Sequence, residues 1–534
     1  MTQPTPAMIT SAMKTRPIIG LEIHVQLRTN TKLFCGCPVA FDAPPNSRVC
    51  PVCLGHPGSL PVLNRRAFEL SVLTGLALHC EIARFTKWDR KSYFYPDLPK
   101  NYQISQYDLP LARHGFFDVP IDGNVRRVRI RRAHLEEDAG KNIHDMPGGT
   151  LVDLNRTGTP LLEIVTEPDL ASAEECFVFC TELQRLVTYL GVSEGVMQKG
   201  QMRFEPNVNV AIEHEGREHR TPIAEIKNLN SFRNVRDAID YEVRRQIAAW
   251  SDDHDYVLGQ APNENRGFNA DKGVTEYQRP KEAAHDYRYF PDPDLVPVEV
   301  TSAMLDEIAA ALTESPMVRR QRFVLQYALS ERDAETIVGH RATADLFEAA
   351  IAAGGPAELV GKQFVNVWLK LANDRNSAVT DLGIDAARMA ELAKLVAEGA
   401  INKTAANQIA EVMVERAAPR ALREPRASAR ADAPTTEDEG SDEESGPAES
   451  RVACSVRELA EELSLIQVQD TAATEAWVEQ AFRENEQAVR DAKDNPKKAK
   501  RAAGFLSGQV MKLSAGKADP KLVARLIETR LREA

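Results

Sequence analysis

The hydrophobic pattern of the chain changes near residue 300, and this change excludes both a single sheet and a single helical bundle. Before it, apolar and polar residues alternate, as in "IIGLEIHVQL" at 18–27, between turn sequences such as "IDGN". After it, the apolar residues of "LFEAAIAA" and "QFVNVWLKLA" recur at helical spacing. Alternation predicts strands, and a period of about 3.6 residues predicts helices. We therefore expect an α+β chain, with an antiparallel-sheet cradle domain over 17–300 and an all-α helical domain over 301–411.

A second boundary follows the helical domain. Residues 432–449 hold eight acids and no Lys or Arg, and they are rich in Pro, Gly and Ser. Such a segment cannot bury a core, so we expect a disordered charged linker over 412–454. Ser455 and Glu458 form a capping-box pattern that opens an all-α tail domain over 455–534. Residues 1–16 lack the apolar segment of a secretory signal and are expected to be a disordered leader.

The bulk properties of the 534 residues narrow the function classes. A net charge of −12 argues against nucleic-acid binding by the whole chain. No run approaches the roughly 18 apolar residues of a membrane span, so no membrane partner is expected. Four of the eight cysteines lie in one short region. That distribution fits a metal site in a reducing, cytoplasmic setting better than a disulfide framework.

The four neighbouring cysteines form two short pairs. Cys35 and Cys37 are separated by one residue, and Cys50 and Cys53 by two. Two such pairs on turns can supply four thiolates to a tetrahedral ion, usually Zn²⁺, with His56 as a possible replacement for one thiol. A closed shell of four thiolates would be structural. The alternative is four reduced thiols without metal.

Acidic residues beside strand-like segments suggest a second kind of metal site. Glu22 and His24 share the polar face of the first strand, and Glu137 and Glu163 lie in or beside apolar segments. An ionised carboxylate in an apolar strand needs a cation or a hydrogen-bond donor. Together these four residues would suit Mg²⁺, which prefers oxygen ligands and keeps water or phosphate oxygens. Each of them alone could equally be a hydrogen-bonded structural group.

Further candidates for binding ATP or substrate lie in basic and aromatic segments. The loop "KWDRKSYFYPDLPKNYQ" mixes cations with aromatic rings, and "YRYFPDPDLVP" at 287–297 partly repeats it. Such a mixture can hold phosphates and stack on bases, although a packed loop has the same composition. No Gly-rich phosphate-binding loop joins a strand to a helix, so if ATP is used, metal, Arg and Lys would hold its phosphates. The candidates in these two segments are Arg90, Lys91, Tyr93, Lys100 and Arg288, and Arg203, Glu205 and Lys227 of "MRFEPNVNV" and "AEIKNLNS" are added from strand-like segments that also carry acids.

Several long segments resemble the B subunit of the bacterial aspartyl/glutamyl-tRNA(Asn/Gln) amidotransferases. They include "GLEIHVQL", "DRKSYFYPDLPKNYQISQYD", "LEEDAGK", "LVDLNRTGTPLLEIVTEPD", "AEIKNLNSFRNV" and "AAGFLSGQVMKLSAGKADPKLV". The resemblance implies a glutamine synthetase-like catalytic cradle, a helical domain and a YqeY-like tail. It also implies that Glu22, His24, Glu137 and Glu163 line a Mg²⁺ and phosphorylation centre.

The function that the resemblance implies is ATP-dependent phosphorylation of the side-chain carboxylate of Glu-tRNA(Gln) or Asp-tRNA(Asn). The chain would work in a heterotrimer with the A and C subunits, and ammonia from the A subunit, a glutaminase, would then give the amide. Lys497, Lys498, Lys500 and Arg501 in the tail would contact tRNA phosphates, or they form a solvated lysine cluster. Two alternatives are the archaeal-type E subunit, which would carry a large insert before the helices, and a non-catalytic tRNA-binding assembly subunit.

Overall fold

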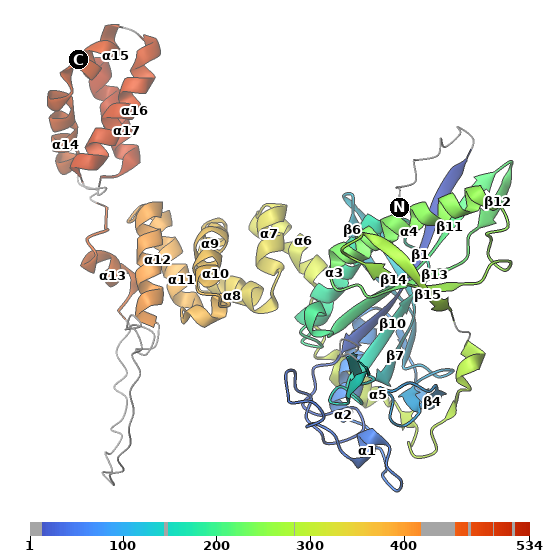
Figure 1. Cartoon of the computed structure of the whole chain (residues 1–534). Helices are drawn as coiled ribbons and strands as arrows, with labels where there is room; N and C mark the ends of the chain where they lie inside the picture. The colour runs from blue at the N-terminus through green and yellow to red at the C-terminus, as the bar shows by residue number, and fades with distance from the viewer. Residues whose placement is uncertain are drawn as a thin grey trace, which may run out of the picture. The chain divides into compact units, whose positions relative to one another are not determined.

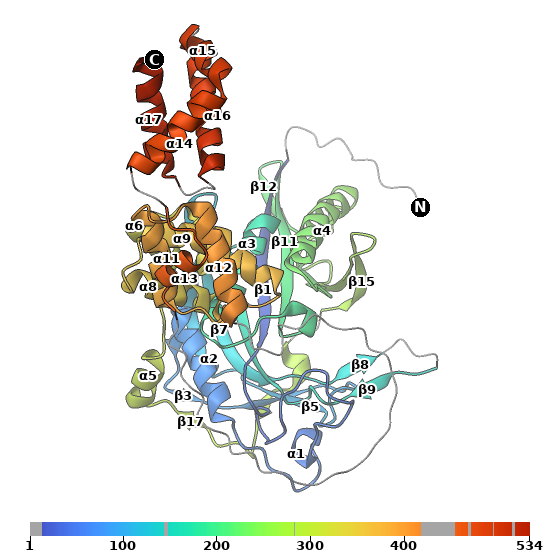
Figure 2. The same cartoon turned by 90° about the vertical axis from the view of Figure 1, so that its left-hand side faces the viewer.

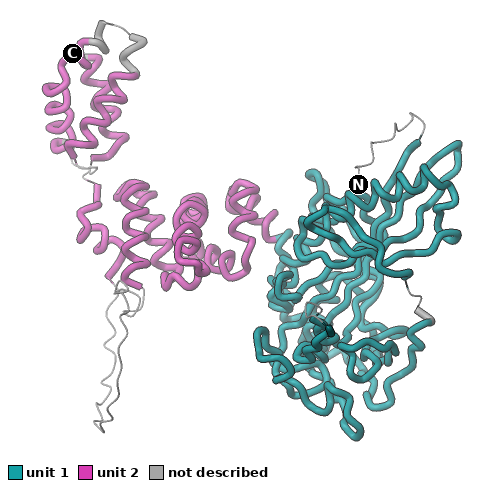
Figure 3. Tube along the Cα trace, viewed as in Figure 1, with its two compact units in different colours: residues 1–318 teal, residues 319–534 magenta. Residues whose placement is uncertain are grey.

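The structure is a computed structural model of the whole chain. It describes residues 13–143, 148–281, 284–417, 454–467, 471–494, 496–514 and 518–533. The chain forms two compact units, residues 1–318 and residues 319–534 (Figure 3). Unit 1 contains the sheets, whereas the described residues of unit 2 form helices and loops only (Figure 1). The α+β class predicted from the sequence is therefore confirmed.

A ten-stranded sheet organises unit 1. Its strand order is β15-β14-β13-β11-β1-β10-β7-β6-β2, with β12 paired to β11. Neighbouring strands are antiparallel except β13 and β14, which are parallel. The strands are β1 (Lys14–Gln26), β2 (Glu81–Ile82), β6 (Ala112–Ile121), β7 (Asn124–Glu137), β10 (Pro160–Thr166), β11 (Met202–His214), β12 (Arg217–Arg220), β13 (Ala224–Lys227), β14 (Glu264–Asn269) and β15 (Val274–Pro280).

The central strand β1 has one apolar and one polar face, as its alternation predicts. Ile19, Leu21 and Ile23 are at most 1% exposed and join the main hydrophobic core. Helices α2 (Arg65–Ala77), α3 (Ala173–Tyr189) and α4 (Phe232–Asp252) pack on the sheet (Figure 2). Burying a side chain of this size stabilises the fold by roughly 1.5–3 kcal/mol. The apolar face is thereby fixed as the interior, and the polar residues of β1 are left for the opposite face.

The long helices begin where side chains cap them. Ser172 accepts a hydrogen bond from the backbone N–H of Glu175 at the start of α3, and Ser231 accepts one from Asn234 at the start of α4. These bonds satisfy backbone donors that the first helical turn leaves without partners. The caps thus define where the chain leaves the sheet and begins to cover it.

Smaller sheets and short helices complete unit 1. The segment that partly repeats the basic aromatic loop lies against that loop, because β16 pairs with β4. The remaining elements are α1 (Pro51–Leu54), β3 (Phe85–Thr86), β4 (Asp89–Ser92), β5 (Tyr102–Ser105), β8 (Lys141–Ile143), β9 (Leu151–Asp153), η1 (Met197–Lys199), η2 (Ala284–Tyr287), β16 (Phe290–Pro291), β17 (Val298–Glu299) and α5 (Ser302–Ala309).

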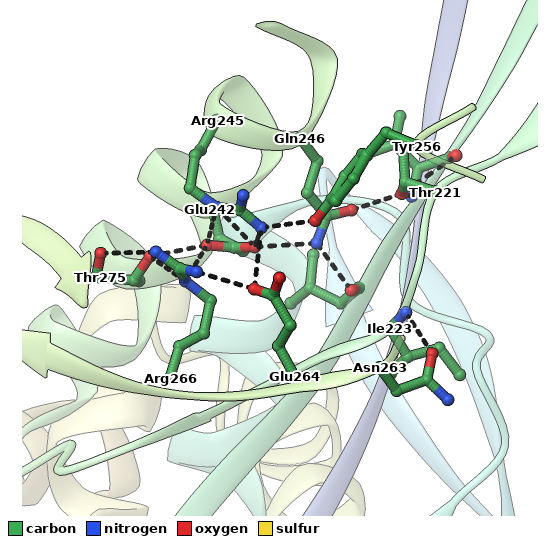
Figure 4. A network of polar contacts seen from close by, with 12 residues as sticks. Thr221, Ile223, Glu242, Arg245, Gln246, Tyr256, Asn263, Glu264, Arg266 and Thr275 are labelled. Atoms are coloured by element: carbon green, nitrogen blue, oxygen red, sulfur yellow. Dashed lines mark hydrogen bonds and ion pairs between the residues drawn. The ribbon is translucent and has the colours of Figure 1, made fainter. Parts of the chain in front are cut away.

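A buried polar network joins α4 to strands β14 and β15 (Figure 4). Glu242 is 0% exposed and forms an ion pair with Arg245 at 2.6 Å. Its other oxygen accepts from Oγ1 of Thr275 at 2.7 Å and lies 3.5 Å from Nε of Arg266. Gln246 donates to Glu242 at 2.9 Å. One carboxylate therefore connects a helix to two neighbouring strands of the sheet.

The helices of unit 2 follow one another with short connections. Phe347 connects three of them, because its ring packs tilted against Phe323 and edge to face against Phe364. The helices are α6 (Pro316–Tyr327), α7 (Glu331–Val338), α8 (Arg341–Ala352), α9 (Ala357–Gln363), the π-helical turn η3 (Phe364–Trp368), α10 (Leu369–Asp374), η4 (Val379–Leu382), α11 (Ala386–Ala397), α12 (Lys403–Ala417), α13 (Val456–Glu462), α14 (Thr471–Glu484), α15 (Glu486–Asp494), α16 (Pro496–Leu513) and α17 (Pro520–Glu533).

Four boundaries differ from those that we predicted. β1 begins at Lys14 and α12 ends at Ala417, so residues that we assigned to the leader and to the linker belong to regular elements. The remainder of the predicted leader and linker, 1–12 and 418–453, lies outside the described residues. Helix α5 packs on α2 and belongs to unit 1, which extends to residue 318 instead of 300.

The fourth difference concerns α13, which we placed in the tail. The predicted capping box is present, since Ser455 accepts from the backbone of Glu458. However, Glu391 of α11 accepts hydrogen bonds from the backbone N–H groups of Val456 and Arg457. α13 therefore packs with the helical domain. Helices α14, α16 and α17 share a separate hydrophobic cluster that includes Val478, Leu506, Val510, Val523 and Ile527.

The Glu242 network yields a stability prediction. Replacing Glu242 with Leu leaves the guanidinium of Arg245 buried beside an apolar group, and removing one partner of a buried pair costs about 3–5 kcal/mol. We expect the midpoint of urea-induced unfolding of unit 1 to fall accordingly. The matched control is Glu276→Leu on β15. It removes an exposed ion pair with Lys272, which precedes this strand, and should leave the midpoint almost unchanged. Equal midpoints for the two variants would contradict the prediction.

Candidate active site

Strand pairing gathers polar residues of four strands on the face of the main sheet opposite the apolar core. β1 pairs with β10 so that His24 lies opposite Glu163, and β10 pairs with β7 so that Glu163 lies opposite His134. On the other side of β1, His24 lies opposite Arg203 of β11. Directly opposed residues in antiparallel strands have Cβ atoms about 4.5–5.5 Å apart on the same face. The register alone therefore brings these side chains into contact distance.

His24, His134, Glu136 and Glu163 form what we call the histidine–carboxylate cluster. Nε2 of His24 lies 3.6 Å from an oxygen of Glu136 and 3.6 Å from an oxygen of Glu163. Nε2 of His134 lies 3.6 Å and 3.4 Å from oxygens of the same two carboxylates. Both carboxylates are buried. Ligand atoms of His24, Glu136 and Glu163 all lie within 4.8 Å of one another, a spacing at which they can hold one cation.

The electrostatics of this cluster favour ionised carboxylates. Burial alone raises the pKa of Glu163, but His134, His24 and Lys91 outweigh it and hold this pKa well below its usual value. Burial likewise opposes the charged form of His24, yet the contact with Glu163 raises the pKa of His24 to about 9. Positive charge is therefore favourable at this position, whether it comes from protons or from a metal ion.

A second group lies beside it on the same face, and we call it the carboxylate–lysine cluster. Glu22 of β1 pairs in register with Glu205 of β11, and their oxygens lie within 4.8 Å of one another and of Glu225 on β13. Nζ of Lys227 lies 2.5 Å from Glu205 and 2.5 Å from Glu225. Lys281, which follows β15, lies 2.8 Å from Glu225 and 3.6 Å from Glu22. Two ammonium groups thus offset most of the charge of three carboxylates.

The acids of this second cluster differ in proton affinity. Burial raises the pKa of Glu225, but Lys227 and Lys281 outweigh it and lower this pKa to about 2. Burial and the neighbouring acids raise the pKa of Glu22, against the opposing effect of Lys281. Since Glu22 is the acid that the lysines neutralise least, it is the one that gains most from an additional cation.

The structure corrects our expectation for Glu137. We expected Glu137 to join Glu22, His24 and Glu163, but successive side chains of a strand point to opposite faces. Glu136 occupies the expected position instead. Glu137 forms an ion pair with Lys100 and accepts from the backbone N–H of Ile104 at 2.9 Å. Glu137 lines a cavity of about 200 Å³, and Cys35 and Cys53 line the same cavity.

A larger cavity, of about 730 Å³, opens at the ends of β1 and β11, where Arg203 lies opposite His24 in the strand register. Arg203 lines it and pairs with Asp138 at 2.9 Å. Lys199 lies at its wall with its ammonium 5.3 Å from the ring centre of Phe41. The lining also includes Arg28, Lys141 and Arg156, so cations outnumber acids around this space. Its size and charge suit an anionic substrate end next to the cluster.

The basic aromatic loop contains a cation that faces the site and others that hold the loop. Lys91 is near Glu136, which raises the pKa of Lys91 above its usual value despite burial, and its ammonium lies 4.8 Å from the ring of Tyr287. Tyr93 packs edge to face on Tyr287. Arg90, by contrast, pairs with Asp292 at 2.8 Å.

Arg90 makes a second ion pair, and Arg288 packs near an aromatic ring. Arg90 pairs with Asp294 at 3.0 Å, and Arg288 lies 5.9 Å from the ring of Phe94. These contacts support the packed-loop interpretation for Arg90 and Arg288, whereas the position of Lys91 near Glu136 supports the interpretation that this lysine holds a phosphate. The two interpretations that the composition left open therefore apply to different residues of the two segments.

The four cysteines predicted as a metal site are brought together. The sulfurs of Cys35, Cys37, Cys50 and Cys53 lie within 4.8 Å of one another, and none forms a disulfide. Sγ of Cys50 and Sγ of Cys53 are 3.9 Å apart. A tetrahedral site with Zn–S bonds of about 2.3 Å has sulfur atoms about 3.8 Å apart. The backbone N–H of Cys50 donates to Sγ of Cys53 at 3.2 Å. This cysteine cluster fits a tetrahedral Zn²⁺.

The predicted basic residues of the tail fall in α16. Lys497, Lys498 and Lys500 lie in its first turns, and their side chains are outside the described part of the chain. Arg501 is exposed on the same helix. Their predicted contact with tRNA thus remains a prediction.

Our predictions from the sequence did not include four residues that the structure brings to the two clusters. His134 and Glu136 lie three and one positions before Glu137, in the same strand, and a period of two would have placed both on one face. Glu225 lies two positions before the predicted Lys227 in the same strand, so the same period would have found it. Lys281 follows β15 and is far from the other acids in sequence, so only pairing of distant strands places it there.

Two family models match the chain. The model described as the GatB/GatE catalytic domain matches residues 17–306, and the model described as the GatB domain matches 345–426 and 450–531. The first match covers the sheet and both clusters. It defines unit 1 as a catalytic domain of an amidotransferase type.

Curated relatives match most of the chain. The B subunit of the aspartyl/glutamyl-tRNA(Asn/Gln) amidotransferase from Rhodopirellula baltica is 48% identical over 74% of this chain and 80% of that protein. The protein of the same name from Caldanaerobacter subterraneus is 40% identical over 97% of this chain and its own whole length. That from Thermomicrobium roseum is 42% identical over 98% of this chain and 99% of its own length. The chain belongs to the family of tRNA amidotransferase B subunits, and it is part of a ligase of translation.

The correction of Glu137 gives a prediction about metal binding. Glu136→Gln removes a carboxylate from the histidine–carboxylate cluster, so the affinity of the chain for Mn²⁺, a paramagnetic substitute for Mg²⁺, should fall by at least about tenfold. Glu137→Gln changes a group on the other face and should leave this affinity within about twofold. Mn²⁺ binding followed by electron paramagnetic resonance measures both. A larger loss for Glu137→Gln than for Glu136→Gln would contradict this assignment.

Proposed function

We propose that the cradle phosphorylates the side-chain carboxylate of Glu-tRNA(Gln), Asp-tRNA(Asn) or both with ATP, and then amidates it with ammonia. The observation that carries this proposal is the pair of adjacent clusters on one sheet face, bordered by Lys91 and Arg203. The names of the relatives support the substrates, since they mention aspartyl and glutamyl tRNA for Asn and Gln. We further propose that unit 1 has a glutamine synthetase-like fold and that helices α14–α17 form a YqeY-like module.

The chemistry explains why so many charges converge. A carboxylate oxygen of the substrate attacks the γ-phosphorus of ATP, and ADP leaves. Ammonia then attacks the carbonyl carbon of the acyl phosphate, inorganic phosphate leaves and a proton is lost. The first step brings anions together, so cations must offset their repulsion. Lys91 and Arg203 would contact the substrate carboxylate or the phosphates, while Lys227 and Lys281 restrain the acids of the second cluster.

The donor atoms of both clusters suit Mg²⁺. His24, Glu136 and Glu163 would hold one ion, and Glu22, Glu205 and Glu225 offer carboxylate oxygens for another. When bound, Mg²⁺ would neutralise phosphate oxygens and act as a Lewis acid. The low pKa of Glu163 supports this role, because a metal-binding carboxylate must be ionised at neutral pH.

A structural Zn²⁺ in the cysteine cluster is a separate proposal. Four thiolates leave no open position for a substrate, so this ion would stabilise the loops around α1. The 3.9 Å separation of two of the sulfurs supports it.

We propose that the chain works with two other subunits of the amidotransferase, the A subunit, which is the glutaminase, and the C subunit. Its own sequence contains no Ser-rich amidase segment. The aminoacyl end of the tRNA would enter the 730 Å³ cavity beside Arg203. None of the helices formed by the described residues combines the length and apolar character that a membrane-crossing helix requires. Because charged tRNA is consumed in translation, we place the reaction in the cytoplasm.

Two alternatives are less well supported. A protein of the archaeal E type would interrupt the passage from cradle to helices with a large insert, whereas the relatives, which carry the name of the B subunit, align over the whole of their own length. A non-catalytic assembly subunit would not need seven buried or half-buried acids and histidines within two clusters.

Glu163→Gln tests the proposed activity. The amide cannot be an anionic ligand, so amide formation on Glu-tRNA(Gln) or Asp-tRNA(Asn) should fall at least a thousandfold in the three-subunit complex. Binding of the charged tRNA should stay within about threefold, as filter binding would measure. The matched control is Glu167→Gln, which alters an exposed pair with Arg131 at the end of the same strand. A Glu163→Gln complex that transamidates at the wild-type rate would refute this centre.

The tail can be removed separately. Because α13 packs with the helical domain, a truncation should remove residues 471–534 and keep 455–462. The truncated complex should bind charged tRNA more weakly, with a smaller dependence on salt, since phosphate contacts release counterions. Glutamine hydrolysis in the complex should persist. Unchanged affinity and salt dependence would show that the tail does not contact tRNA.

A further inference from the structure

Lys32 is a lysine with no exposed surface, next to the cysteine cluster. It is 0% exposed, and its Nζ donates to the carbonyl oxygen of Arg48 at 2.7 Å and to Sγ of Cys53 at 3.6 Å. Among the residues that the structure describes, no carboxylate forms an ion pair with this ammonium. A buried ammonium without a neighbouring negative charge is strongly unfavourable. The nearby carboxylate of Glu137 forms its ion pair with Lys100, so the side-chain acceptor that Lys32 contacts is the sulfur of Cys53.

A zinc-loaded cysteine cluster is rich in negative charge. Four thiolates around one Zn²⁺ carry a formal charge of two minus, because four negative charges meet two positive ones. One ammonium in contact with a sulfur halves that excess. Lys32 and a zinc-loaded cluster are thus complementary in charge.

The main chain and the surrounding residues hold Lys32 in this position. Its backbone N–H donates to the carbonyl of Cys37 at 3.0 Å, and its carbonyl accepts from the side chain of Asn64 at 3.2 Å. The stem passes Gly158, where a Cβ would lie 3.6 Å from Cδ of Lys32 and 3.5 Å from Cβ of Cys53. Because the side chain of Lys32 has no exposed surface, the contact of its ammonium with Cys53 lies in the interior of unit 1.

We propose that Lys32 is part of the metal site, as a positioning residue that stabilises the zinc-loaded form by donating to the sulfur of Cys53. This inference rests on the zinc site proposed above. It assigns Lys32 a function that a residue of the hydrophobic core does not have, since its ammonium contributes to zinc retention.

Lys32→Met tests this inference in the full chain, because Met keeps most of the length and removes the charge. Transfer of zinc to a chromogenic chelator should be about 10–100-fold faster than in the wild type, the range that partners of metal ligands usually contribute. Lys370→Met is the matched control, since Lys370 is exposed on α10 of unit 2. Lys32→Gln, which can still donate to the carbonyl of Arg48, serves if the Met variant does not fold.

Unfolding of metal-free protein separates this function from a merely structural one. Because all four thiolates meet around zinc, Lys32→Met should lower the urea midpoint of zinc-loaded protein more than that of metal-free protein. Zinc transfer at the wild-type rate, or equal destabilisation with and without zinc, would overturn the inference while leaving the zinc site intact. Wild-type protein purified without zinc would overturn both.

Discussion

The pairing of β1 with β10 on one side and β11 on the other is the interaction on which the rest of the structure depends. It places His24 opposite both Glu163 and Arg203, and Glu22 opposite Glu205. Because the period of a strand is two, a shift of one residue in either pairing would exchange the polar face with the apolar one. The buried apolar residues of β1 forbid such a shift. Hydrophobic burial therefore fixes the positions of the charged groups, although it does not involve them directly.

Charge balance is the second constraint. The two clusters crowd carboxylates that would repel one another in isolation, and the structure offsets them with imidazoles and ammonium groups. The balance is local: Lys227 and Lys281 hold Glu225 ionised, whereas Glu22 remains the acid that an added cation favours most. The same principle recurs at the cysteine cluster, where a buried ammonium faces sulfur. A reaction that joins a carboxylate to a phosphate needs such prearranged positive charge.

The position of the second cluster also depends on contacts away from it. Glu225 lies on β13, whose parallel neighbour β14 carries Arg266. Arg266 reaches Glu242 of α4, so the helix that covers the apolar face also restrains strands at the edge of the sheet (Figure 4). Buried ionic contacts of this kind are sensitive to loss of one partner, which leaves the other charge without compensation. A substitution in α4 can therefore affect the site without touching it.

Local pattern in the sequence determined the α+β class, the capped helices, the polar face of β1 and the grouping of the four cysteines, because alternation, capping and short spacing act over a few residues. It also predicted Glu163 correctly as a buried acid. Glu137, by contrast, pairs with Lys100 on the other face of β7, and strand parity puts Glu136 beside Glu163 instead. Only the tertiary structure brought His134, Glu225 and Lys281 to the clusters. It also decided that α5 belongs to unit 1, that α13 packs with the helical domain, and that Lys32 is buried beside sulfur. These outcomes depend on strand order and on packing between distant segments, and no local spacing encodes which distant strand becomes a neighbour.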